Sequence, residues 1–231
     1  MTLLETVIEE AQGTGSVPSL LRRMKTLAIR IGARDTLLPW VDRELRGYGE
    51  GDPLPSYRGP FNVAPVGNFF GMGGVQLTGH PVSRTGFSEA AAASLFTRRL
   101  YGSVAEVESC AQNKLLHFNW PGEAVSHYNS LIKNGKTNLA SHFACLGVKY
   151  RIPQAIYVDI LDQVRNLALD LALELEAVAP QAGEPAAGDE INTEARHVIE
   201  QHWHIGVMSV SDSNLTFGSS GAVAQQLTDG Q

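Results

Sequence analysis

The sequence has 231 residues, of which 43% are hydrophobic and 18% are charged, so it is long and apolar enough to fold as one domain with an appendage or as two small domains. Its net charge of −6 is unevenly placed. The last 54 residues carry seven acids and one base, whereas the first 177 carry 17 of each. This balance argues against a basic nucleic-acid-binding surface over the whole protein.

Other classes of protein are excluded by simple patterns. No stretch approaches 18 consecutive apolar residues, so we expect no membrane span. Acidic residues stand in the first twelve positions, where a secretory signal would need a basic start and an apolar run. The two cysteines, Cys110 and Cys145, form no disulfide framework and suit a reducing compartment. We therefore expect a soluble, cytoplasmic protein.

The first 47 residues are predicted to form three helices. Apolar residues recur at helical spacing, and glycine or an N-cap residue marks each boundary. The short connections favour antiparallel neighbours. The expected helices run from Leu3 to Gly13, from Ser16 or Ser19 to Gly32, and from about Asp35 to Arg46.

Residues 47–87 change character, because glycine and proline interrupt short apolar pieces. We interpret them as two or three short strands or an extended arm packed on the helices. Helices are expected to resume from Ser88 to Tyr101, after Ser103 and from Gly122 to Ile132. Residues 136–150 are interpreted as a further short helix.

The strongest helical pattern follows Pro153 and ends near Val178. Its wide apolar face predicts a buried central helix, although the same face would also suit a dimer seam. The fold class is therefore mainly α, a helical bundle of residues 1–178 with a small β or extended insertion at 47–87.

The remaining chain is divided into a linker and a tail. Residues 179–190 are rich in Pro, Gly, Ala and acids, which predicts a flexible acidic linker. Residues 191–231 predict a short helix, from Thr193 to about Gln201, followed by short strands that are not stable alone. The candidate assembly residues in these strands are Ile205, Val207, Leu215, Phe217 and Val223.

No catalytic constellation is recognisable in the sequence. The phosphate-binding loop and the strand–turn–helix serine motif are absent, and neither cysteine lies in a motif of activated thiols. His197, His202 and His204 lack the spacing and the further ligands of a metal site, so we expect neither a metal nor another cofactor. A local excess of basic residues between residues 20 and 46, which includes Arg22 and Arg23, is either a solvated helix face or a contact for phosphate or an acidic partner.

Three separate motifs resemble the AbiTii domain family. They are LLRRMKTLAIRIGARDTLLPWVDRELRGYG at 20–49, LPSYR at 54–58 and ILDQVRNLALDLALELE at 160–176, and the resemblance covers roughly residues 1–180. Arg46 departs from the family pattern, which more often has Asn there. The resemblance implies a bacterial abortive-infection context, in a domain often associated with larger defence proteins, but implies no catalytic mechanism.

The motif residues also make a physical prediction. Trp40, Glu44 and Tyr48 lie four residues apart on one helical stripe, and the loop that follows brings Tyr57 and Arg58. We expect Glu44 and Arg58 to pair under the two tyrosines, which favours a structural role and leaves a binding pocket as the alternative. The candidate ligand- or partner-binding residues are Arg22, Arg23, Trp40, Glu44, Tyr48, Tyr57 and Arg58.

Two functions remain open at this level. The first is a non-enzymatic defence module that binds a partner or ligand and forms a homo-oligomer through its C-terminal tail, with a second defence protein as another partner. The alternative is a toxin-like effector enzyme that acts on nucleic acid or nucleotides through Glu44 and Arg58. A toxin directed at the cell envelope ranks last.

Overall fold

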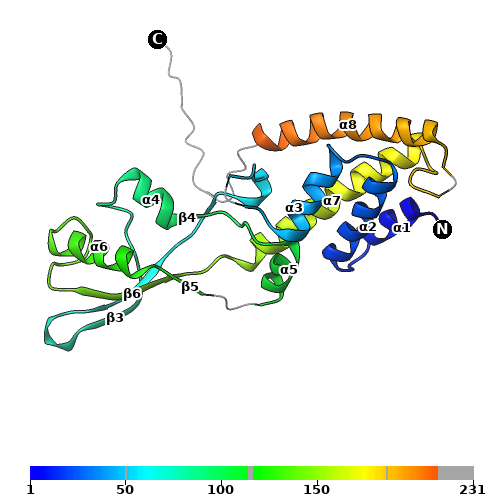
Figure 1. The fold of residues 1–231 in the computed structure, drawn as a ribbon. Coiled ribbons are helices and arrows are strands. Elements are labelled where there is room, and N and C mark those ends of the chain that lie inside the picture. The colour runs from blue at the N-terminus through cyan, green and yellow to red at the C-terminus, as the bar shows by residue number, and fades with distance from the viewer. Residues whose placement is uncertain (50, 114–116, 186, 213–231) are drawn as a thin grey trace, which may run out of the picture.

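The computed structural model describes residues 1–49, 51–113, 117–185 and 187–212, the last eleven of them by their backbone alone. Figure 1 shows two lobes, a helical lobe with α1, α2, α3, α5, α7 and α8, and a sheet lobe with α4, α6 and the larger sheet. The helices of the first lobe are α1 (Leu3–Gln12), α2 (Val17–Arg30), α3 (Leu37–Arg46), α5 (Val104–Gln112), α7 (Gln154–Val178) and α8 (Asp189–Asp212).

Local signals in the sequence set the boundaries of these helices. Thr2 and Glu5 form a capping box at the start of α1, and Pro18 stands in the first turn of α2, where its missing N–H is not needed. Gly47 ends α3 with a φ of 93°, which side chains other than glycine rarely adopt. The serine side chain of Ser103 accepts the Glu106 amide and so caps α5.

The central helix of this lobe is α7, against which α1, α2, α5 and α8 pack. Its 25 residues contain neither glycine nor proline, so the helix runs without a break. The prediction of a buried central helix is confirmed, because one face of α7 lies within the core. Its fully buried residues include Ile160, Val164, Ala168, Leu171 and Leu175.

The sheet lobe is built on a four-stranded antiparallel sheet in the order β3-β2-β6-β5. Phe69, Cys145 and Val148 are buried on the side of the sheet that packs against α6, whereas Phe70, the next residue along β2, points to the opposite, uncovered face. Leu146, at an irregularity of the β2–β6 register, is also exposed. A small two-stranded ladder of β1 and β4 lies between the lobes. The elements are β1 (Phe61–Asn62), β2 (Val66–Phe70), β3 (Gln76–Pro81), α4 (Glu89–Phe96), β4 (Thr97–Arg98), β5 (Phe118–Asn119), α6 (Gly122–Lys133) and β6 (Ala144–Tyr150), with short 3₁₀ turns η1 (Ser56–Arg58) and η2 (Met72–Gly74).

The mainly helical fold with a small β component is confirmed, and so is extended structure within residues 47–87. The helix expected within residues 136–150 is wrong, because Ala144–Tyr150 is the strand β6. This strand pairs with β2 on one side and β5 on the other, and these ladders satisfy its backbone groups in place of helical hydrogen bonds.

The segment expected to be a flexible linker makes contacts with the body. Ala182 is fully buried, and the Gly183 carbonyl accepts a hydrogen bond from Arg30 on α2. The Glu184 side chain accepts the Leu3 amide at the start of α1. The small residues that suggested a linker allow this close approach, and the segment between residues 179 and 185 is a packed turn.

The helix after this turn is much longer than predicted. α8 extends through Ile205 and Val207, so the prediction of strands at these two positions is wrong. Extending a formed helix adds one backbone hydrogen bond per residue, whereas a short strand needs a partner. The other assembly candidates, Leu215, Phe217 and Val223, lie outside the described residues.

Candidate functional site

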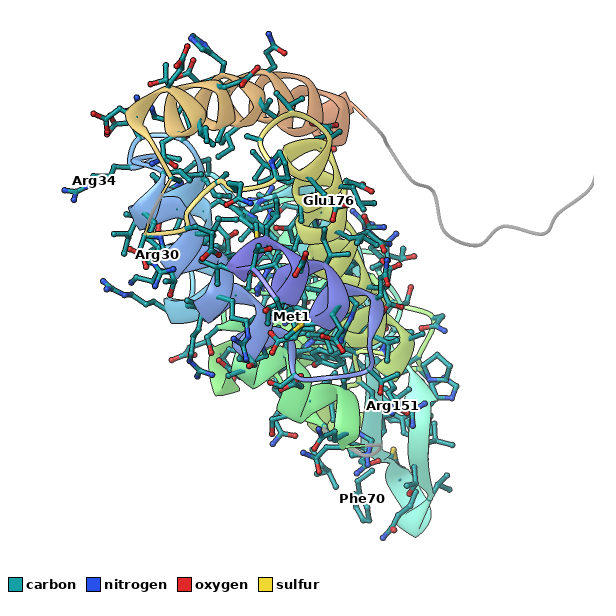
Figure 2. All side chains as sticks on the ribbon, turned by 90° about the vertical axis from the view of Figure 1, so that its right-hand side faces the viewer. Met1, Arg30, Arg34, Phe70, Arg151 and Glu176 are labelled. Carbon is teal, nitrogen blue, oxygen red and sulfur yellow. The ribbon has the colours of Figure 1, made fainter. Side chains whose placement is uncertain are left out.

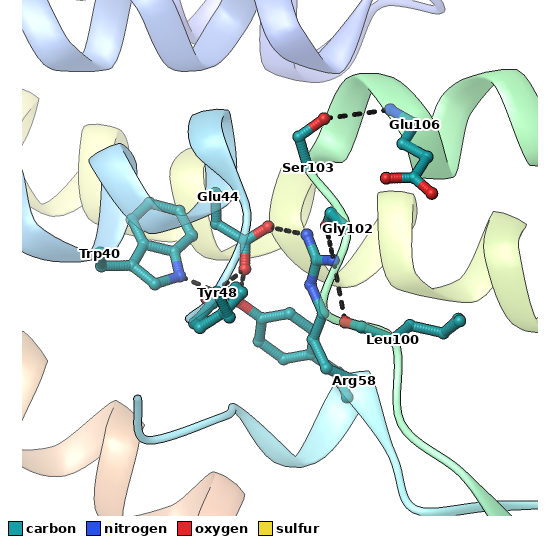
Figure 3. Close-up of polar contacts among 9 residues, drawn as sticks. Trp40, Glu44, Tyr48, Arg58, Leu100, Gly102, Ser103 and Glu106 are labelled. Atoms are coloured by element: carbon teal, nitrogen blue, oxygen red, sulfur yellow. Dashed lines mark hydrogen bonds and ion pairs between the residues drawn. The ribbon is translucent and has the colours of Figure 1, made fainter. Parts of the chain in front are cut away.

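A cluster of polar side chains surrounds Glu44 at the end of α3 (Figure 3). The Glu44 Oε1 atom accepts hydrogen bonds from the hydroxyls of Tyr48, at 2.6 Å, and Tyr57, at 2.7 Å. Its Oε2 atom accepts from the Arg58 guanidinium, which completes an ion pair. Trp40 Nε1 donates to the Tyr57 hydroxyl at 2.8 Å. The pairing under two tyrosines that the sequence predicts is confirmed.

Two local features bring these residues together. Trp40, Glu44 and Tyr48 follow each other at intervals of four along α3 and its end, so they share one stripe. Pro55 then starts the 3₁₀ turn η1, which directs Tyr57 and Arg58 back onto that stripe. The cluster thus joins a helix end to the loop that follows it.

Arg58 also reaches a third segment of the chain. Its Nη1 atom donates to the carbonyl of Leu100 at 3.2 Å and to that of Gly102 at 2.5 Å (Figure 3). The backbone adds two hydrogen bonds here, from the Tyr48 amide to the Tyr101 carbonyl and from the Leu100 amide to the Arg58 carbonyl. The cluster therefore connects the segment that leaves the helical lobe, residues 48–58, to the segment that returns to it, residues 100–102.

The electrostatics of the cluster are those of a closed site. Glu44 and Arg58 are both 0% exposed. Burial, and next the charge of Glu44, raise the pKa of both Tyr48 and Tyr57 well above the usual range. Both hydroxyls therefore stay protonated and remain hydrogen-bond donors to the carboxylate. The arrangement can stabilise a buried charge and fix the path of the backbone, but it presents no free carboxylate to a substrate.

The other predicted site residues lie elsewhere. Arg22 and Arg23 are exposed on α2, and Arg23 pairs with Glu10 at 2.7 Å. Two more bases of the same region are paired with acids, Lys25 with Asp42 and Arg43 with Asp52. These three ion pairs offset part of the basic excess. The structure therefore does not bring Arg22 and Arg23 together with the Glu44 cluster.

A metal site needs several His, Cys, Asp or Glu side chains that converge, and a reactive thiol needs a lowered pKa. His197 lies 3.7 Å from Glu200, and the side chains of His202 and His204 fall outside the description. Within the described ranges, no group of three or more His, Cys, Asp or Glu side chains is placed to hold a metal ion. Burial raises the pKa of both Cys110 and Cys145.

The sequence reasoning missed the uncovered face of the sheet lobe. Phe70 and Leu146 are exposed on it, and an open pocket of about 340 Å³ lies beside it, with Asn68, Asn119 and Lys149 in its lining. A signal for this face was present, because residues 61–83 contain no Asp, Glu, Lys or Arg. Figure 2 shows Phe70 at the opposite end of the molecule from Arg34.

No helix in the part of the chain that the structure describes is long and apolar enough to span a membrane. The fold and the site together define a two-lobed, mainly helical protein with a buried polar cluster where the two lobes join. A model of the AbiTii family matches residues 2–201, and the chain therefore belongs to the AbiTii family, whose name points to abortive-infection defence. Comparisons with curated proteins and with solved structures found no match.

The third family motif has a structural role that resembles that of the cluster. Arg165 on α7 donates to the carbonyls of Glu10, Gly13 and Gly15, at 3.2, 2.6 and 2.8 Å. These carbonyls lie at the C-terminal end of α1 and in the turn after it, where a cation is favoured. The motif residues thus fix how neighbouring segments of the helical lobe meet.

Proposed function

We propose that this chain is a non-enzymatic binding and self-assembly module of abortive-infection defence. The observation that carries the proposal is the complete burial of Glu44 and Arg58, the two residues best suited to acid–base or phosphate chemistry. A catalytic group has to come within hydrogen-bond reach of its substrate. Both carboxylate oxygens of Glu44 are already occupied by Tyr48, Tyr57 and Arg58.

In such a module the cluster would fix the orientation of the two lobes relative to each other. It ties α3 and η1 to the segment before α5, and these are the connections by which the chain passes to the sheet lobe and back. A fixed orientation of the two lobes lowers the conformational entropy that is lost when a partner binds. The cluster would therefore support binding without touching the partner.

The experiment that tests the non-enzymatic role compares single and paired substitutions. Glu44→Leu and Arg58→Met each leave one buried charge unpaired, whereas the double variant removes both charges at similar volume. We expect phage defence, measured as efficiency of plating, to fall in each single variant along with thermal stability. The double variant still leaves the Tyr48 and Tyr57 hydroxyls without their acceptor, so it should regain part of both.

A double variant that is stably folded and yet has no defence activity would overturn the proposal. The polar groups would then have a chemical task, and the effector enzyme that acts on nucleic acid or nucleotides would be favoured. Incubating the wild-type protein with labelled RNA, DNA and nucleotides, with and without a divalent metal ion, would then identify the substrate.

The self-assembly part of the proposal has its own test. Three of the assembly residues, Leu215, Phe217 and Val223, lie beyond α8, so deletion of residues 213–231 removes them and keeps every described helix. We expect the deletion to lower the mass of the particle in light scattering. An unchanged mass contradicts assembly through the tail.

A further inference from the structure

The β2–β3 hairpin is the far end of the sheet lobe (Figure 1), and Figure 2 shows Phe70 at this end of the molecule. Exposed apolar side chains gather in and beside its turn. Met72 is 75% exposed, Val75 48% and Phe70 45%. Leu146, 69% exposed, lies on the neighbouring strand β6, at the register irregularity beside Phe69. We call these four residues the tip patch.

The tip patch lies in a part of the molecule that has no charged side chains. Residues 61–83 and 137–148, which hold β2, β3 and most of β6, contain no Asp, Glu, Lys or Arg. The exposed apolar residues of α7 are different, because Leu173 is followed by Glu174. An exposed apolar patch on a protein surface marks an interaction site when it is continuous, whereas single apolar residues among charges are ordinary.

The same hairpin ends in an open strand edge. β3 is the outermost strand of the sheet, and among the described residues nothing pairs with its outer edge. Proteins blunt such edges with charges, prolines or irregular backbone. Here Gly79, with a φ of 66°, and Pro81 lie toward the far end of β3, while Gln76, Leu77 and Thr78 beside the tip carry none of these devices.

We propose that a second copy of the chain docks on the hairpin, with the two β3 edges paired antiparallel over Gln76–Thr78. This pairing brings Met72 and Val75 of each copy beside the hairpin of the other, whereas Phe70 on β2 and Leu146 on β6 lie one and two strands behind the paired edge. A charged partner surface would lose its hydration against a hairpin that offers no opposite charge, which is unfavourable. The partner surface must therefore be uncharged as well, and the hairpin itself meets this condition. Antiparallel pairing of one edge with its own copy is also self-complementary about a two-fold axis. This interface is independent of the tail and of the assembly proposed for it.

Charge swaps in the full chain test this interface. Met72→Glu with Val75→Glu, and Met72→Lys with Val75→Lys, place like charges on both copies at positions that are already exposed, so the monomer fold is kept. Each double variant alone should show half the wild-type mass in light scattering. An equimolar mixture of the two should regain the wild-type mass, because opposite charges then meet. Leu173→Glu, an exposed apolar residue of α7, is the matched control and should leave the mass unchanged.

Three results would overturn the inference. They are a wild-type chain that is monomeric at the highest concentration reached, a wild-type mass in either charged variant, and a mixture that stays at half mass. If the mass responds to deletion of residues 213–231 but not to the tip variants, the tail alone drives assembly. That outcome rejects the hairpin interface and leaves the proposed function standing.

Discussion

Glu44 accepts three hydrogen bonds in a place that water does not reach, and each donor comes from a different residue. A buried ion pair of this kind adds little net stability, because the loss of hydration offsets most of the attraction between the charges. Its removal is costly only when one charge is left behind. The pair therefore fixes the geometry of α3, η1 and the segment before α5 more than it strengthens the fold.

The first prediction concerns one half of this pair. Arg58→Met leaves the Glu44 carboxylate buried without its cation and should lower the free energy of unfolding by about 3–5 kcal/mol, as measured in urea. Arg22→Met, at an exposed position of α2, is the control and should change it by less than about 0.5 kcal/mol. Equal effects of the two substitutions would contradict the structural role of Arg58.

The second prediction concerns Tyr157, which is buried on α7 beside Cys110. Burial, and next the neighbouring Cys110, raise the pKa of Tyr157 to about 12 from the ordinary value near 10. Since the folded form binds the proton more tightly, the contribution of this group to stability is full below about pH 10 and is lost as the pH rises toward 12.

Denaturation curves at several values of pH between about 9 and 12 measure this effect. The free energy of unfolding should fall with pH in the wild type, by up to about 1.4 kcal/mol per pH unit for one such tyrosine. Tyr157→Phe should show a shallower slope. The same slope in both proteins would mean that Tyr157 titrates normally in the fold.

At the scale of elements, α7 organises the helical lobe through polar contacts as well as through its apolar face. Arg165 holds three carbonyls at and after the end of α1, which are groups that no further turn of helix satisfies. Arg165 thus links α1 and the turn after it to α7, the central helix of the lobe. Loss of these hydrogen bonds should loosen α1 before the rest of the lobe.

The third prediction follows from this link. Arg165→Gln should lower the free energy of unfolding by about 1.5–3 kcal/mol, the range for hydrogen bonds to a charged group. Hydrogen exchange should show that the amides of α1 gain the most in exchange rate. Arg165→Lys keeps the charge but not the planar fork, so an intermediate effect is expected. Faster exchange spread evenly over both lobes would argue against a local link.

The elements differ in how far they could be predicted from the sequence. The bounds of α7 were predicted closely because its pattern is local, with apolar residues three and four apart over 25 residues. β6 could not be predicted in this way, because it is held by β2, more than seventy residues earlier in the chain. Its short apolar run fits a helix or a strand equally well when the partner is unknown.

The same difference applies within the cluster. The contacts of Glu44 with Tyr48, Tyr57 and Arg58 follow from the spacing of the side chains and could be predicted. The acceptors at Leu100 and Gly102 are backbone carbonyls, which leave no trace in the residue types. Whether a side chain is open to a ligand also depends on the whole fold, so the sequence favoured a covered pair but left a binding pocket open, and the structure shows both side chains 0% exposed.

At the scale of the whole molecule, charge is divided among three regions. The sheet lobe has a hairpin without charges, the first helices of the helical lobe pair acids with bases on their surface, and the chain from residue 178, which includes α8, holds the excess of acid. Two ways of assembling are thus open, through the hairpin and through the tail. They differ in the electrostatic work that association requires.

This difference gives the fourth prediction, which concerns ionic strength. Copies joined through residues 213–231 bring their α8 helices near one another, and these helices repel because each carries five acids and one base. Salt screens this repulsion over a distance of about 10 Å at 0.1 M. Tail-driven assembly should therefore strengthen between about 0.05 and 0.5 M salt, a range that moves the screening length from about 14 to about 4 Å. Hairpin-driven assembly brings together no charged side chains and should respond little to salt.

Sedimentation of the full chain and of the 213–231 deletion across this range distinguishes the two interfaces. The deletion should lose the salt-dependent part of the assembly and keep the salt-independent part. An assembly of the full chain that dissociates as salt rises would contradict both interfaces, because it would have to be held by attraction between opposite charges.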